Sequence, residues 1–246
     1  MRSIDDIMDF RTDISPFLVH LTRTSDGQVA RARLESIIGE KKLEVGPTLV
    51  SHASFGFPYM ELQNPAVAEF FQAVCFTETP LDQIHCLLDV QDRAVNLEPY
   101  GLVFLRQRLQ ERGVAPVIYL NNELGDKPPL VQALAQLVDE KPDIARQILP
   151  LIAVFGKKLP PACQGVPPSG RIDFLWEREW RWPRSRGDFS FNITDVFIGL
   201  CPHDEISEFE NMLPLVRFVD PRRNMRWYST QLIEMRQRRD LTQSVV

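Results

Sequence analysis

The sequence predicts an α+β protein in which a mixed sheet of short strands is flanked by helices. Short segments with strand-like patterns recur along the 246 residues, and the 19 prolines point to irregular connections between them. Segments with helical periodicity are grouped in the first two-thirds of the chain. The composition, 44% hydrophobic and 25% charged, is ordinary for a globular protein. We expect one domain over residues 1–246, because the part after the proline-rich stretch is too small to fold alone.

The expected strands are apolar or alternating runs bounded by proline, glycine or charged residues. The first, at residues 17–23, is mostly apolar, so we expect it to be central in the sheet. A late strand at 176–182 combines tryptophans with charges and ends at Pro183. The remaining strands are expected at residues 43–47, 73–79, 100–104, 115–120, 189–193, 195–200 and 215–219.

The expected helices carry apolar residues at helical spacing. In residues 29–40, for example, Leu34, Ile37 and Ile38 fall on one face. The helix at 144–155 is expected to bend or break at Pro150. The remaining helices are expected at residues 3–10, 65–72, 81–88, 105–112, 130–138, 204–212 and 231–239.

Three segments are expected to contain irregular structure. Residues 48–64 show no period and are rich in serine, glycine, proline and aromatic residues, which is typical of a long loop that covers a site. Residues 157–170 are rich in proline and glycine and predict an internal loop. Residues 231–246 are expected to form a basic C-terminal tail whose helix is frayed.

Charge and cysteine content narrow the class of protein. The net charge of −5 gives no general basic surface for nucleic acid, although a local basic patch remains open. No CxxC pair occurs among Cys75, Cys86, Cys163 and Cys201, so we expect free thiols and no metal. No apolar run is long enough for a membrane span, and the acidic N-terminal residues lack a signal-peptide pattern. These features predict a cytoplasmic protein without a membrane partner.

The stretch 176–182 is the most informative candidate site. It contains three of the four tryptophans together with Glu177, Arg178 and Glu179. On an extended strand, acids at i and i+2 share one face, and their repulsion raises the pKa of one of them. Such a pair suits acid/base chemistry or the holding of a sugar hydroxyl. The alternative is a half-buried edge strand with inward tryptophans and solvated charges.

Earlier strands supply further candidates. His20 can hold a ribose hydroxyl, because imidazole both donates and accepts hydrogen bonds, or it can be a hydrogen-bonded core residue. Thr77 and Thr79 share one strand face with Glu78 on the other, although Thr79 also suits a helix cap. Tyr100 can stack a planar heterocycle or pack against a neighbouring helix. Walker, GxSxG, HExxH and GxGxxG motifs are absent, so the corresponding enzyme classes lack support.

The order of these motifs resembles the AbiGi-type family of bacterial abortive-infection proteins. Those proteins share a CF(S/T)E strand, a YG strand and a late E-x-E-W-R segment. This chain has the matching runs at residues 75–78, 100–101 and 177–181, after a His-Leu-Thr-Arg run at 20–23. The resemblance extends in patches over residues 17–181. It implies a bacterial phage-defence or toxin–antitoxin protein with a partner toxin or antitoxin.

The same layout is similar to the ADP-ribosyltransferase fold, which implies NAD as a substrate. In one branch of that superfamily, a His, a Tyr and a Glu line the NAD pocket. The matching residues here are His20, Tyr100 and either Glu177 or Glu179. The resemblance also implies that a carboxylate stabilises an oxocarbenium-like state at the nicotinamide ribose.

In the other branch, an Arg, a Ser/Thr-x-Ser/Thr strand and a Glu-x-Glu turn line the pocket. The matching residues are Arg23, Thr77 with Thr79, and the acids at 177 and 179. Arg23 is then expected to pair with the pyrophosphate. The chain matches part of each pattern. Either way, the acceptor of ADP-ribose is expected to be a protein or nucleic acid.

Two other functions fit the sequence. A non-enzymatic antitoxin or sensor would bind its partner through aromatic residues of 48–64 and of the tryptophan-rich strand. A nucleic-acid-directed effector would use the basic and aromatic residues near the C-terminus, which otherwise form a solvated tail. Those residues are Arg222, Arg223, Arg226, Trp227 and Tyr228.

Overall fold

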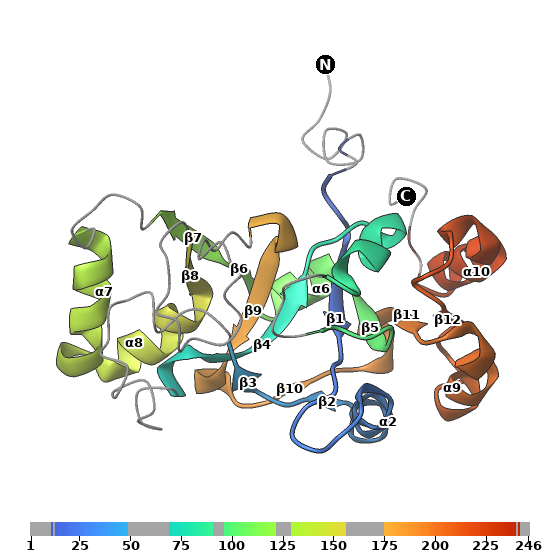
Figure 1. Cartoon of the computed structure of the whole chain (residues 1–246), viewed down its shortest axis with the longest axis horizontal. Coiled ribbons are helices and arrows are strands. Elements are labelled where there is room, and N and C mark those ends of the chain that lie inside the picture. Colours follow the sequence, from blue (N-terminus) through green and yellow to red (C-terminus); the bar gives the residue numbers. More distant parts are fainter. Residues whose placement is uncertain are drawn as a thin grey trace.

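A computed structural model describes residues 11, 13–48, 69–90, 96–121, 129–155, 175–239 and 241. Its main sheet contains β1 (Phe17–Leu21), β3 (Gly46–Pro47), β4 (Gln72–Thr77), β5 (Gly101–Leu105), β6 (Ala115–Pro116), β9 (Glu179–Pro183), β11 (Val196–Leu200) and β12 (Phe218–Val219). The order of this eight-stranded sheet is β12-β11-β5-β1-β4-β9-β6, and β3 also pairs with β4. Parallel and antiparallel pairs both occur, so the predicted α+β class with a mixed sheet is confirmed (Figure 1).

Strand β1 is central, as its apolar run predicts. It pairs antiparallel with β5 along its whole length, from Phe17 opposite Leu105 to Leu21 opposite Gly101. On its other side it meets β4 only at Val19, opposite Thr77. β1 is therefore paired along its whole length on the β5 side and at a single position on the β4 side.

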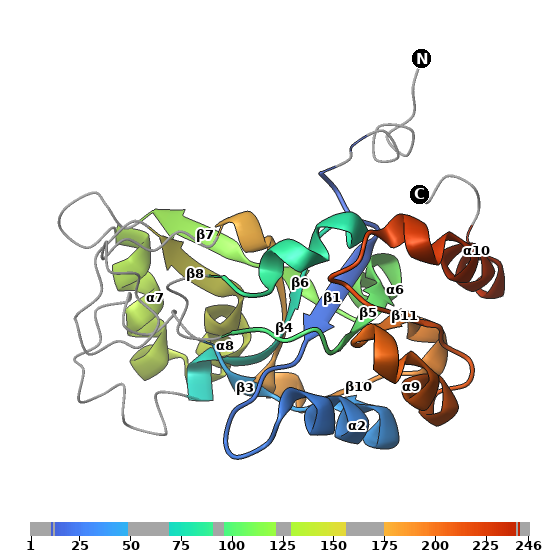
Figure 2. The ribbon, with the colours of Figure 1, turned by 45° about the vertical axis from the view of Figure 1, so that its right-hand side comes forward.

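Helices surround the sheet on several sides. They are α2 (Ala30–Glu40), α6 (Arg106–Glu111), α7 (Pro129–Glu140), α8 (Pro142–Ile148), α9 (Ile206–Met212) and α10 (Ser229–Arg238). Figures 1 and 2 show α7 and α8 at one end of the molecule and α9 and α10 at the other. Along the chain, α2, α6, α7 and α8 lie in the first two-thirds, as expected, and α9 and α10 occupy the two later segments where the sequence also predicts helices. Among the described residues, no helix is both long and apolar enough to cross a membrane.

The core has a layer on each face of the main sheet, because successive strand side chains point to opposite faces. One layer contains Leu18 and Phe104 and packs against α2, α6 and α9. The other contains Val19 and Val103 and packs against α10 and the 3₁₀ helix Leu81–Leu87. A third, smaller cluster joins α7 and α8 to the 3₁₀ turn Glu69–Phe71, which precedes β4.

Two predicted elements divide partway along. The expected strand 115–120 divides at Val117 into β6 and β7 (Ile118–Asn121), which belong to different sheets. The expected helix 144–155 ends at Ile148, and its last residues form β8 (Ile152–Phe155), which pairs parallel with β7. Pro150 lies in the 3₁₀ turn between them, where its missing N–H group leaves no helical bond unmade.

The tryptophan-rich strand is shorter than expected. Residues Leu175–Glu177 form a 3₁₀ turn, and β9 begins only at Glu179. Between them Arg178 has a left-handed backbone with φ of 46°. The expected strands at 189–193 and 215–219 also shorten, to β10 (Phe189–Ser190) and β12, and β10 pairs with β2 (Lys42–Leu43).

Several predictions fall on residues that the structure does not describe. They are the helix at 3–10, residues 49–64 of the covering loop, the start of the helix at 65–72, and the loop at 157–170. The described part of the C-terminal tail is docked rather than frayed. Met235 of α10 is fully buried, and Arg239 donates hydrogen bonds to the carbonyl oxygens of Val196 and Ile193.

Candidate functional site

A cavity opens where β1 and β4 separate. β3 pairs with the beginning of β4, at Ala73, and β1 pairs with its end, at Thr77. Between these two contacts, the Nδ1 atom of His20 lies 2.8 Å from the carbonyl oxygen of Cys75. The cavity has a volume of about 280 Å³ and is lined by residues of β1, α2, β3, β4 and β9.

Most of the predicted site residues meet in this cavity. His20 and Arg23 reach it from the first strand and the residues after it, Thr77 from β4, and Glu177 and Glu179 from the turn and start of β9. These residues come from three distant parts of the sequence. The sheet therefore brings together the residues that the sequence patterns selected separately.

Tyr100 does not line the cavity. Its hydroxyl donates a hydrogen bond to Glu205, at 2.8 Å, and its ring lies 6.1 Å from that of Phe209. The strands that follow Tyr100 and contain His20 pair without a gap, and a Cβ atom at Gly101 would lie 2.2 Å from the His20 carbonyl oxygen. The two strands leave no room for a ligand between them, so Tyr100, which the resemblance places in one pocket with His20, is separated from the cavity that His20 lines. The cavity lies at the opposite edge of β1.

Thr79 also lies outside the cavity lining, but it contacts Thr77. The two hydroxyl oxygens are 2.8 Å apart, and Thr77 donates to the carbonyl oxygen of Glu177 at 2.5 Å. The following 3₁₀ helix is capped at Pro80 without a side-chain hydrogen bond, so Thr79 does not cap it. The predicted threonine pair thus fastens the Glu177 turn to β4.

Glu179 forms a bidentate ion pair with Arg181. The Nε and Nη2 atoms of Arg181 lie 3.0 and 2.7 Å from the two carboxylate oxygens. Burial alone would lower the pKa of Arg181, but the negative charge of Glu179 outweighs it and raises that pKa. The Nη1 atom also donates to the carbonyl oxygen of Pro150. Glu179 is therefore held in one orientation, and a cation offsets the repulsion expected between the two acids.

His20 is a neutral hydrogen-bonding group. Burial lowers its pKa more than the bond to the Cys75 carbonyl raises it, so the ring is uncharged at neutral pH. A carbonyl oxygen only accepts hydrogen bonds, which places the ring proton on Nδ1. The Nε2 atom is then the acceptor that can receive a hydrogen bond from a ligand hydroxyl.

This lowered pKa predicts a pH dependence of stability. The unfolded chain, in which a histidine has a pKa of about 6.5, takes up the proton before the folded protein does. Acidification below about pH 6.5 is therefore expected to lower the unfolding free energy, with a slope that approaches ~1.4 kcal/mol per pH unit, until the folded pKa of His20 is reached. His20→Gln should remove this part of the slope in urea titrations between pH 7 and 5. The exposed His85→Gln is the control, and equal slopes for wild type and His20→Gln would contradict the prediction.

Sequence reasoning missed several residues that line the cavity. Tyr119 accepts a hydrogen bond from the Glu179 backbone N–H at 3.1 Å, and burial raises its pKa to about 12. Arg181 is two residues after Glu179 on the same strand, so the spacing already places it on the same face. Tyr119 carries no such signal, because the sequence does not show that its strand changes sheet.

The cavity also contains cations at the α2 side. Arg33 pairs with Asp26, and Lys42 pairs with Glu40 at 3.1 Å. Arg23, in contrast, makes no ion pair with any residue that the structure describes. Arg23 is thus the cation most available to an anionic ligand.

The cysteines and the described acids and histidines show no metal arrangement. Among the described residues, no three His, Cys, Asp or Glu side chains form a group that could hold a metal ion. Cys75, Cys86 and Cys201 are free thiols, and Cys163 lies outside the described residues. Burial and the charge of Glu179 raise the pKa of Cys75, so this cavity thiol stays protonated.

The aromatic surfaces that a partner-binding antitoxin or a nucleic-acid-directed effector would need are only partly formed. Of the tryptophans in the 176–182 stretch, Trp176 is exposed, Trp182 is half-buried and Trp180 is in the core. Near the C-terminus Trp227 is exposed, but Tyr228 is buried.

In comparisons with known proteins, the chain matches no family model, no curated protein and no solved structure.

Proposed function

We propose that this chain binds NAD in the cavity and transfers ADP-ribose to a macromolecule, as part of a bacterial phage-defence or toxin–antitoxin system. The observation that supports the proposal is the meeting of His20, Arg23, Thr77, Glu177 and Glu179 around one cavity. The cavity combines two carboxylates, an arginine without a described ion-pair partner and a neutral imidazole. These groups suit a ligand with sugar hydroxyls and a diphosphate.

The two carboxylates have different tasks in this proposal. The glycosidic bond between nicotinamide and C1′ of the ribose breaks, and its electron pair leaves with nicotinamide. Glu179 is fixed by Arg181, so it can hold the ribose 2′-hydroxyl and stabilise the positive charge that develops on the sugar. Glu177, from the adjoining turn, orients the acceptor nucleophile, which bonds to C1′ as its proton passes to the Glu177 carboxylate.

The remaining groups bind and orient the substrate. Arg23 pairs with the diphosphate, and the Nε2 atom of His20 accepts a hydrogen bond from a ribose hydroxyl. Tyr119, which lines the cavity where Tyr100 does not, is the aromatic residue placed to stack against the nicotinamide.

Isothermal titration calorimetry with NAD tests the proposal. We expect saturable heat, and at about 100 times the dissociation constant the bound ligand should stabilise the fold by ~2.7 kcal/mol. Arg23→Ala should weaken binding by about 10- to 100-fold, since a hydrogen bond to a charged group contributes ~1.5–3 kcal/mol. Arg184→Ala, outside the cavity, is the matched control. No heat with millimolar NAD and no thermal shift would reject the proposal.

A further inference from the structure

Arg178 separates the two cavity acids and shapes the chain between them. Its left-handed backbone, with φ of 46°, is one that L-residues other than glycine adopt only at an energetic cost. In a continuous strand Glu177 would extend the β9 ladder and lie opposite Thr79. The turn at Arg178 instead ends the 3₁₀ helix at Glu177 and starts β9 at Glu179.

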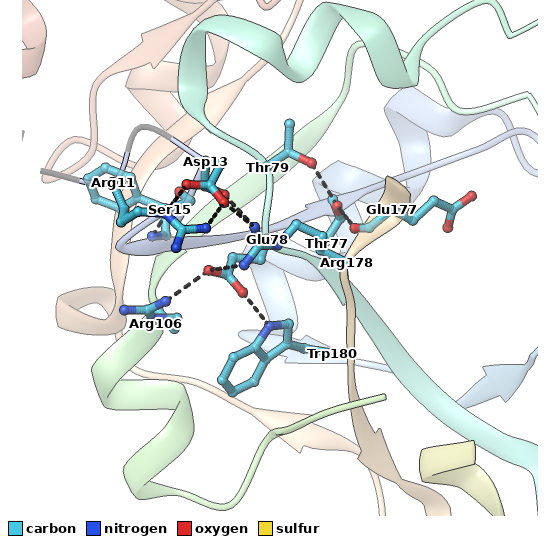
Figure 3. A network of polar contacts seen from close by, with 11 residues as sticks. Arg11, Asp13, Ser15, Thr77, Glu78, Thr79, Arg106, Glu177, Arg178 and Trp180 are labelled. Atoms are coloured by element: carbon cyan, nitrogen blue, oxygen red, sulfur yellow. Dashed lines mark hydrogen bonds and ion pairs between the residues drawn. The ribbon is translucent and has the colours of Figure 1, made fainter. Parts of the chain in front are cut away.

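The side chain of Arg178 is anchored away from the cavity. Its Nη2 atom lies 3.4 Å from the Glu78 carboxylate, and its Nη1 atom donates to the Asp13 carbonyl oxygen at 2.5 Å. Glu78 is itself buried, and Arg106 and Trp180 donate to its two oxygens at 2.8 and 3.0 Å. Figure 3 shows Arg178 directed into this network while the Glu177 side chain points away from it.

The backbone of the turn uses the same anchor. The Arg178 N–H donates to the carbonyl oxygen of Leu175, and its own carbonyl oxygen accepts from the Glu78 N–H at 3.1 Å. Thr77, next to Glu78, binds the carbonyl oxygen of Glu177. Thr77, at the end of β4, and Glu78, directly after it, therefore bind the carbonyl groups of Glu177 and Arg178 in the turn.

We propose that Arg178 is a positioning residue, which holds this turn and so directs the Glu177 carboxylate into the cavity. The inference rests on the function proposed above. Arg178 is not among the residues that line the cavity, so it acts through the turn and not through the substrate. Its loss is expected to slow the reaction and leave NAD affinity nearly unchanged, because His20 and Arg23 lie on other elements.

The test compares Arg178→Ala, Arg178→Gly and Arg178→Lys with wild type. Hydrogen exchange measured by mass spectrometry should rise about tenfold or more at residues 175–179 in the alanine variant, since the turn opens more often, and by less in the glycine variant, whose backbone adopts the left-handed conformation without that cost. In these variants kcat for hydrolytic nicotinamide release, in which water is the acceptor that Glu177 orients, should fall about tenfold and so less than in Glu179→Gln, while the dissociation constant of NAD changes less than about twofold. Arg178→Lys keeps a cation near Glu78 and should restore most of both properties. The glycine variant also serves if the alanine variant does not fold.

Arg184→Ala, at the other end of β9, is the matched control and should behave as wild type. Wild-type exchange at 175–179 in the alanine and glycine variants would overturn the proposal, whether or not the chain acts on NAD. So would an equal rise of exchange in β5 and β11, which would mean a general loss of stability. A wild type that never releases nicotinamide would reject the proposed function instead, and a local rise of exchange would still establish the anchoring role of Arg178.

Discussion

Replacing Glu179 by glutamine is expected to lower the rate of nicotinamide release by about 10²- to 10³-fold, the usual effect of losing one electrostatic contact to the transition state. Glutamine keeps the shape of the side chain but removes the charge that faces the oxocarbenium-like sugar. Glu177→Gln should retain more of this hydrolytic release, because Glu177 is assigned to the acceptor. The Glu177→Gln variant should lose more of its rate of ADP-ribose transfer to a protein or nucleic-acid acceptor.

The same substitution is expected to destabilise the fold. The repulsion of two neighbouring acids, taken alone, predicts that removing one charge leaves the protein as stable or slightly more stable. In the structure, however, Glu179 compensates Arg181, whose side chain is only 3% exposed. Removing one partner of a buried pair costs ~3–5 kcal/mol. Glu179→Gln should therefore lower the melting temperature clearly.

Rate and stability must be separated in this experiment. Nicotinamide release should be measured at a temperature where circular dichroism shows every variant to be folded. The exposed Glu111→Gln is a control that removes a carboxylate outside the cavity. Full activity in both Glu177→Gln and Glu179→Gln would end the catalytic assignment of these acids.

The strands and helices that the sequence predicts well are those whose burial pattern is uniform. β5 and β11 are buried along their whole length and read as unbroken apolar runs. In α2, Leu34 and Ile38 repeat at helical spacing and are buried. The prediction of one continuous strand in residues 115–121 is wrong because each half looks like a strand locally. Only tertiary pairing assigns the two halves to different sheets.

The predictions of site residues likewise succeed where a local signal exists and fail where it does not. The chemical types of His20, Arg23 and Glu179 identify them as candidates before the fold is known. The placement of Tyr100 in the same pocket as His20 is wrong because the edge of β1 that stays open depends on strand order, which no local pattern contains. The turn before Glu179 could not be predicted for another reason: nothing about arginine at position 178 favours a left-handed backbone.

Trp180→Ala is expected to cost ~3–5 kcal/mol of unfolding free energy, the usual cost of removing a buried large aromatic side chain. Trp180 is 8% exposed and stands opposite Phe76 across the β4–β9 pair. Its indole N–H also donates to the buried Glu78 carboxylate at 3.0 Å. Urea unfolding followed by circular dichroism measures the loss.

Trp176→Ala is the matched control, because Trp176 is 46% exposed and precedes β9 in the same stretch. Surface substitutions usually change stability by less than ~0.5 kcal/mol, so a comparable loss in both variants would contradict the burial of Trp180. Trp180→Phe then separates packing from hydrogen bonding. It keeps a ring but leaves one Glu78 oxygen without its indole donor, which should cost ~1–3 kcal/mol. A phenylalanine variant as stable as wild type would show that Arg106 and Arg178 are enough to hold Glu78, the carboxylate on which the turn of the proposed active site is anchored.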